Sequence, residues 1–152
     1  MKKMSFISCM LLMPVLTTYA QQTKVENNTE YHSVELSKAD RKFLALKDTA
    51  QKHLSQFIDS LIKRNPHSHC TFSVKSDFVE NDVHEHMWSQ IFIYKNGSFE
   101  GIFIDSPFNL KNIKTGDKVI INKAAVEDWI IEDTNTNAQI GYFSKGYLDS
   151  KN

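Results

Sequence analysis

Two short motifs carry the residue types that could do chemistry in this chain. The first is Glu85-His86-Met87-Trp88, and the second is Glu127-Asp128-Trp129. An imidazole held by a carboxylate is a common arrangement for a general base, or for a group that changes charge near neutral pH. If the two motifs meet in the fold, they would form one surface. The candidate binding residues are therefore Glu85, His86, Trp88, Asp128 and Trp129.

Each of these residues also has a structural interpretation. His86 could hydrogen-bond a loop and stiffen the end of a sheet. Trp129 could fill the end of a small barrel, and Asp128 could cap a nearby turn. The structural role is the commoner one for residues of these types, and both interpretations stay open at the level of sequence.

A second group of chemically capable residues is rich in histidine. Zinc favours such ligands, and histidines two positions apart on a strand share a face. A turn at Asn81-Asp82 would place His84 beside Val79 or Glu80 rather than near His69, and the spacing fits no standard zinc framework. Nucleophile elbows and glycine-rich phosphate loops are missing from the sequence. We predict no metal site, no cofactor and no catalytic residues, although the group contains His67, His69, Cys70, His84 and His86.

The N-terminus has the three parts of a secretory signal peptide. Met1-Lys2-Lys3 is followed by an apolar run from Phe6 to Leu16, and a small residue, Ala20, suits a cleavage site. The run is shorter than the roughly 20 residues that span a bilayer. We predict a signal peptide at residues 1–20, a periplasmic or secreted product, and no stable membrane span after cleavage.

The remaining chain fits one domain without nucleic-acid affinity. The formal net charge of the 152 residues is zero, and no basic stripe marks a nucleic-acid partner. Removal of the signal peptide would leave Cys70 as a single cysteine, which cannot form an internal disulfide. It would be a buried apolar side chain or a free thiol.

Helical periodicity follows a polar segment. Residues 21–36 lack a sustained pattern and predict a flexible leader. Ser37 resembles an N-cap, and Asn65-Pro66 would end the helix because the residue before proline avoids the α region. Apolar residues recur between them at steps of three and four, which predicts an amphipathic helix of about seven turns. These residues are Phe43, Leu46, Ala50, Leu54, Phe57, Ile58, Leu61 and Ile62.

Beyond the helix, the period changes to two, as in strands. The strands expected are 70–78, 85–94, 98–105, 119–121 and 138–143, while 124–129 fits either a helical turn or a bent strand. The prediction is one α+β domain over residues 37–148. It has one long N-terminal helix packed on a strongly bent antiparallel sheet of about five strands, partly barrel-like.

Asn96-Gly97 predicts a two-residue hairpin, which sets a register. In that register Tyr94 lies opposite Phe99, Phe92 opposite Gly101, and Trp88 opposite Asp105. The hairpin then carries apolar residues on both faces, so we expect both faces to be covered.

The order of these segments is similar to a known pattern. It contains Glu85-His86-Met87-Trp88, the Asn-Gly hairpin, Ser106-Pro107, a Lys-Thr-Gly-Asp turn, and Val126-Glu127-Asp128-Trp129. Over about residues 70–143 the chain resembles the YegJ-like family of small bacterial proteins, a domain of unknown function. The resemblance implies a short, often exported, compact α+β or barrel-like domain. One departure is Asp105-Ser106-Pro107, where the family commonly has Asn-x-Pro.

These observations favour binding over catalysis. We expect an exported bacterial protein that acts as a small non-enzymatic binding or interaction module of the cell envelope, with another envelope protein as its partner. The alternative is a hydrolase or metal-dependent enzyme that uses His86 with a nearby carboxylate.

Overall fold

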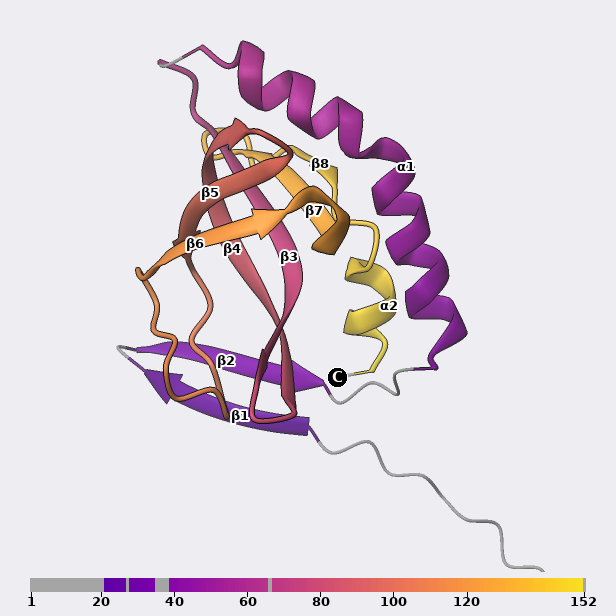
Figure 1. Cartoon of the computed structure of the whole chain (residues 1–152), viewed down its shortest axis with the longest axis vertical. Coiled ribbons are helices and arrows are strands. Elements are labelled where there is room, and N and C mark those ends of the chain that lie inside the picture. Colours follow the sequence, from indigo (N-terminus) through magenta and orange to yellow (C-terminus); the bar gives the residue numbers. More distant parts are fainter. Residues whose placement is uncertain (1–20, 27, 35–38, 66, 152) are drawn as a thin grey trace, which may run out of the picture.

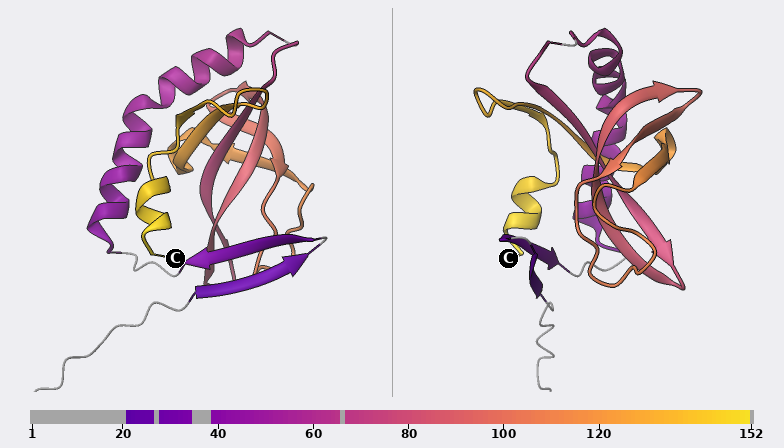
Figure 2. Two further views of the ribbon diagram at one scale, coloured as in Figure 1. Left: turned by 180° about the vertical axis from the view of Figure 1, so that it is seen from behind. Right: turned by 90° about the vertical axis from the view of Figure 1, so that its left-hand side faces the viewer.

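The computed structural model describes residues 21–26, 28–34, 39–65 and 67–151 (Figure 1). The predicted signal peptide and Ser37 lie outside these residues. A long helix, α1 (Arg41–Lys63), lies along one face of a six-stranded antiparallel sheet (Figure 2). A separate two-stranded sheet and a short C-terminal helix complete the described chain. The α+β class is confirmed.

The helix begins at a different cap from the one predicted. Asp40 is the N-cap, because its carboxylate accepts hydrogen bonds of 3.0 Å from the backbone N–H groups of Lys42 and Phe43. The helix ends at Lys63, two residues before Asn65-Pro66, as the sequence indicates. Its buried side is made of Phe43, Ala50, Leu54, Phe57 and Leu61.

The sheet has six strands rather than about five. Its order is β6-β5-β4-β3-β7-β8, and every neighbouring pair is antiparallel. The strands β6 and β8 are its edges, so the sheet does not close into a barrel. The bounds are β3 (Cys70–Glu80), β4 (Val83–Lys95), β5 (Ser98–Phe103), β6 (Lys118–Asn122), β7 (Val126–Asp133) and β8 (Gln139–Gly141).

The segment 124–129, for which the sequence allowed two structures, contains both. A 3-10 turn, η1 (Lys123–Ala125), leads directly into β7. Asn122 caps this turn by accepting a hydrogen bond of 2.9 Å from Ala124 N–H. The turn carries the chain from one edge of the sheet to a strand beside β3.

Both predicted hairpin turns are present. Asn81 and Asp82 have φ of 49° and 64°, and Asn96 and Gly97 have φ of 52° and 77°. Two successive residues with positive φ match the right-handed twist of the flanking strands, which is why Asn, Asp and Gly are favoured there.

The predicted register of β4 and β5 is correct only near the turn. Tyr94 lies opposite Phe99, but Phe92 is an extra residue in a β-bulge, so Ile91 rather than Phe92 lies opposite Gly101. The prediction that Trp88 lies opposite Asp105 is also wrong. Instead, Trp88 N–H donates a 2.7 Å hydrogen bond to the Asp105 carboxylate.

The bulge changes which side chains share a face. Met87 and Ile91 of β4 now lie on the buried face with Phe99 and Phe103 of β5. On the other face Ile93 is 49% exposed. The expectation that both faces of this hairpin are covered is therefore wrong.

The core lies between the buried face and α1. The Phe57 ring is fully buried, and its centroid lies 5.7 Å from Phe72, 5.7 Å from Phe99 and 5.5 Å from Trp129. Burying a side chain of this size contributes about 1.5–3 kcal/mol. Phe57 thus joins the helix to β3, β5 and β7.

The two ends of the described chain are more ordered than predicted. The segment 21–36 contains a hairpin, β1 (Gln21–Glu26) and β2 (Thr29–Val34), rather than unpaired chain throughout. Lys24 docks it by donating a 2.7 Å hydrogen bond to Ser106 Oγ. Helix α2 (Lys145–Asp149) occupies the predicted frayed tail. In the described residues, neither helix has the length and apolarity needed to cross a membrane.

Candidate functional site

The two motifs flank the central strand of the sheet. Lys75 of β3 lies opposite Trp88 of β4 on one side and Asp128 of β7 on the other. Strand β3 therefore brings Glu85-His86-Met87-Trp88 and Glu127-Asp128-Trp129 together, although they are distant in sequence. The register of β3 with β7 shifts between Lys75 and Ser76, next to the second motif.

His86 and Glu127 form the direct link between the motifs. His86 Nδ1 lies 2.5 Å from Glu127 Oε2, and Lys47 Nζ of α1 lies 3.2 Å from Glu127 Oε1. The Phe43 ring meets the imidazole edge-on, with centroids 5.6 Å apart. The link therefore ties α1, β4 and β7 together at the N-terminal end of the helix.

The electrostatics of this link favour a charged Glu127. Its side chain is only 4% exposed, and this burial by itself would raise the pKa of the carboxyl group. The hydrogen bond and charge of His86, followed by those of Lys47, outweigh burial and lower the pKa below its usual value. The His86 side chain is 34% exposed, so its ring lies at the surface.

Glu85 is a loop clamp. Its carboxylate accepts hydrogen bonds from the backbone N–H groups of Phe108 (2.9 Å), Asn109 and Leu110 (3.3 Å). Glu80, at the end of β3, holds the next residues of the same loop. Charge-assisted hydrogen bonds to backbone N–H groups are strong, so Glu85 fixes the loop that follows β5.

Asp128 holds the chain after β8 in place. It is 1% exposed, and its carboxylate accepts from the N–H groups of Trp129 (2.8 Å), Phe143 (3.1 Å) and Ser144 (2.9 Å) and from Ser144 Oγ (2.5 Å). Four donors satisfy a carboxylate that is otherwise costly to bury. The turn-capping interpretation describes this geometry.

Trp129 lies in the core. It is fully buried, and its indole N–H donates a 2.9 Å hydrogen bond to the backbone carbonyl of Ala50 in α1. Its ring packs against Phe57 and Phe143. In this conformation, direct contact of Trp129 or Asp128 with a ligand would require the core to open.

Trp88 lies nearer the surface. Its half-buried ring meets Tyr142 edge-on, with centroids 5.3 Å apart, and Lys75 Nζ lies 5.8 Å from its centroid. Burial lowers the pKa of Lys75, against the opposing charges of Asp105, Asp128 and Glu127. Burial also raises the pKa of Asp105, against the Trp88 hydrogen bond and the charge of Lys75.

The sequence did not identify every member of this site. It predicts a nearby carboxylate for His86 without specifying which one, and in the structure the partner is Glu127. Lys47 and Lys75 were not among the candidates. Strict alternation along β7 puts Glu127 on the same face as Trp129, and only the register shift beside it explains its contact with His86. No local sequence signal indicates that shift.

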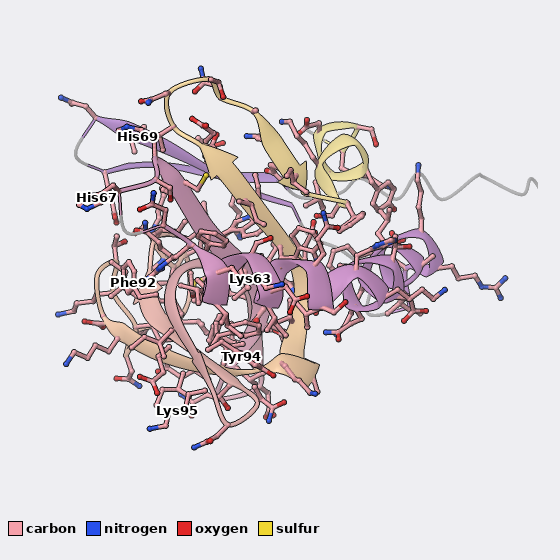
Figure 3. The ribbon with its side chains drawn as sticks, turned by 90° about the horizontal axis from the view of Figure 1, so that it is seen from above. Lys63, His67, His69, Phe92, Tyr94 and Lys95 are labelled. Carbon is pink, nitrogen blue, oxygen red and sulfur yellow. The ribbon has the colours of Figure 1, made fainter. Side chains whose placement is uncertain are left out.

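His84 lies where the predicted turn at Asn81-Asp82 would place it. His84 lies opposite Val79, and its Nδ1 is 2.7 Å from Asp77 Oδ2. Figure 3 shows His67 and His69 at the end of the molecule beyond the C-terminus of α1. Among the described residues, no three His, Cys, Asp or Glu side chains converge as metal ligands do.

Comparison with known proteins places the chain in a family. The family model DUF2314, described as "Uncharacterized protein conserved in bacteria", matches residues 40–149. The chain belongs to the DUF2314 family. The match includes α1 and most of the described sheet domain, and so extends beyond residues 70–143, where we noted the resemblance.

A relative agrees with this assignment. "Uncharacterized protein YegJ" of Escherichia coli (strain K12) is 30% identical over 81 residues, which are 53% of this chain and 51% of that protein. The chain thus spans about half the length of the curated relative that it matches. The predicted resemblance to YegJ-like proteins is confirmed. No solved structure matches the chain.

In this DUF2314 domain, most of the motif side chains support the fold. Met87 and Trp129 fill the core, Glu85 and Asp128 hold loops, and Glu127 is buried under His86. Only His86 and Trp88 present ring surface beside Lys47, Lys75 and Tyr142. These five residues form what we call the motif surface.

Proposed function

We propose that this protein is an exported, non-enzymatic binding module of the bacterial cell envelope, and that it recognises another protein through the motif surface. Membership of an uncharacterised bacterial family supports a bacterial setting. The export part of the proposal rests on the residue pattern of positions 1–20, which has the charged start, apolar run and small residue of a signal peptide.

One observation carries the binding part of the proposal. Glu127 holds the His86 ring and Asp105 holds the backbone N–H of Trp88, while both rings remain partly accessible. Rings held in one position lose little conformational entropy on binding, and aromatic residues are enriched at the centres of protein interfaces. Lys75 and Lys47 add donors beside them.

The enzyme alternative has less support. An imidazole whose Nδ1 is held by a carboxylate is suited to proton transfer. Within the described residues, however, His86 hydrogen-bonds to Glu127, at 2.5 Å, and not to a hydroxyl or thiol group. We therefore retain binding as the proposal.

Export is tested by the mass of the accumulated protein. We expect the intact mass of protein from a periplasmic or culture fraction to correspond to a chain that begins at Gln21. Full-length protein confined to the cytoplasm would refute the export part and leave the binding part to be tested separately.

Binding is tested by photo-crosslinking in living cells. A benzophenone side chain replaces Trp88 in one strain and Lys52, an exposed residue of α1, in the matched control. We expect a discrete crosslinked protein from position 88 and none from position 52. The purified partner should then bind His86→Ala at least about tenfold more weakly, a loss of about 1.4 kcal/mol. Equal crosslinking from both positions would contradict the proposal.

A further inference from the structure

The C-terminal end of α1 and the β4–β5 hairpin together combine exposed apolar and cationic side chains. Figure 3 looks down on this end and shows Lys63, Phe92 and Lys95 on the side that faces the viewer. The feature is distinct from the motif surface, whose His86 contacts Phe43 in the first turn of α1. We call it the hairpin end and define it by Ile62, Lys63, Arg64, Phe92, Ile93 and Lys95.

The apolar part of the hairpin end is exposed. Ile62 is 63% exposed, Ile93 49% and Phe92 41%. The bulge at Phe92 contributes to this exposure, because it places both Phe92 and Ile93 outside the core. Ile93 lies opposite Glu100, which in turn lies opposite Ile120, itself 74% exposed. The apolar surface thus continues to the edge of the sheet, interrupted by one acid.

The cationic part comes from the same two segments as these side chains. Lys63, Arg64 and Lys95 are all exposed, and their long stems let the charges reach beyond the apolar groups. On the same segments, these three cations compare with two acids, Glu100 opposite Ile93 and Asp59 one turn before Lys63. Exposed apolar side chains beside exposed cations match a surface with negative charge outside and hydrocarbon beneath, which describes an anionic bilayer.

We propose that the hairpin end docks on the surface of an anionic phospholipid bilayer, with Phe92 and Ile93 in the headgroup boundary and Lys63 and Lys95 over lipid phosphates. Along α1, Lys47 of the motif surface lies roughly 24 Å from Lys63, at about 1.5 Å per residue, and along β4, Trp88 lies roughly 13 Å from Phe92, at about 3.3 Å per residue. The two surfaces therefore use different residues of the same two elements. The inference does not depend on the proposed protein partner.

The test is co-sedimentation of the protein, in the processed form that cells accumulate, with large vesicles. We expect binding to vesicles that contain phosphatidylglycerol, no binding to phosphatidylcholine vesicles, and release as salt is raised. The double variant Lys63→Gln/Lys95→Gln should partition about twenty-fivefold more weakly, since each basic residue near an anionic surface contributes about fivefold. Phe92→Ser/Ile93→Ser should also bind more weakly.

A matched control separates this site from general charge attraction. Lys111→Gln/Lys114→Gln removes two exposed lysines from the loop that Glu85 and Glu80 hold, and should leave vesicle binding unchanged. Equal losses in the two lysine variants would overturn the proposal, as would undetectable binding or equal binding to phosphatidylcholine. Sedimentation velocity gives a further check: an oligomer dispersed by Phe92→Ser/Ile93→Ser, without vesicle binding, would show that this end contacts a second copy instead.

Discussion

Asp128 provides a sharp test of how the second motif works. If its carboxylate holds the 142–144 turn against the sheet, Asp128→Ala leaves three backbone N–H groups and the Ser144 hydroxyl without their buried acceptor. If its main role is to contact a ligand, the same change should have little effect on folding. The two roles predict different free energies of unfolding.

The magnitude follows from the number of donors. An unsatisfied buried donor costs about 1–3 kcal/mol, but the costs are not additive, because the turn can relax and admit water. Removal of one side of a buried charged network typically costs about 3–5 kcal/mol. We expect a loss in this range for Asp128→Ala. It is a large share of the roughly 5–15 kcal/mol that stabilises a domain.

The assay is urea denaturation followed by tryptophan fluorescence, which reports on buried Trp129. Asp149→Ala is the control, because it removes an acid from an exposed ion pair with Lys145 and should not move the midpoint measurably. The double variant Asp128→Ala/Ser144→Ala should lose less than the sum of the single losses, since both remove the same hydrogen bond. A loss below about 1 kcal/mol for Asp128→Ala would refute the structural role.

Three further predictions concern other parts of the fold. The wild type should have a higher free energy of unfolding than Glu127→Gln, and this difference should be full above pH 4.5. It should disappear as the pH falls through the lowered folded pKa of Glu127, because protonation breaks the bond of this carboxylate to His86. Urea denaturation at several pH values would contradict this if the difference persisted in acid. Gly101→Ala should destabilise the fold strongly, because a Cβ there would overlap the backbone carbonyl of the facing strand. Its control, Gly146→Ala in α2, has open space around the new Cβ and should be neutral or slightly stabilising. Equal melting temperatures for the two variants would show that Gly101 does not approach the facing strand closely. Glu85→Ala should speed hydrogen exchange of the loop amides that it holds, and unchanged protection would exclude a clamp.

The elements that the sequence predicts correctly depend on local rules. Asn96-Gly97 forms its turn because both residues accept positive φ, whatever surrounds them. The spacing of apolar residues in α1 predicts the length of the helix and its buried side, because only one apolar stripe of a helix packs against the core. Long, periodic segments of this kind specify their structure without knowledge of their partners.

The errors arise where strands must be aligned over several residues. Nothing about Phe92 marks it as the extra residue of a bulge, yet the bulge changes which β5 residues share a face with the β4 residues that precede Phe92. The register shift beside Ser76 similarly determines that His86 meets Glu127. Both depend on how the sheet twists to bury its core.

Within the site, residue type identified the region but not the roles. His86 and Trp88 were correctly grouped on one side of β4, because residues two apart on a strand share a face. The sequence does not single out Lys75, because a lone lysine in an alternating strand normally faces solvent. Its place in the site follows from the strand order, in which β4 and β7 lie on either side of β3.

The strand order has a consequence for how the chain matures. Strand β3 gains one neighbour within a few residues, through the turn to β4, but its other neighbour, β7, is synthesised only after β4, β5 and β6. Until then, one margin of β3 has open backbone groups that other chains could pair with. Contacts between such distant segments also slow folding. We therefore expect nascent fragments that end before residue 126 to aggregate or to depend on chaperones.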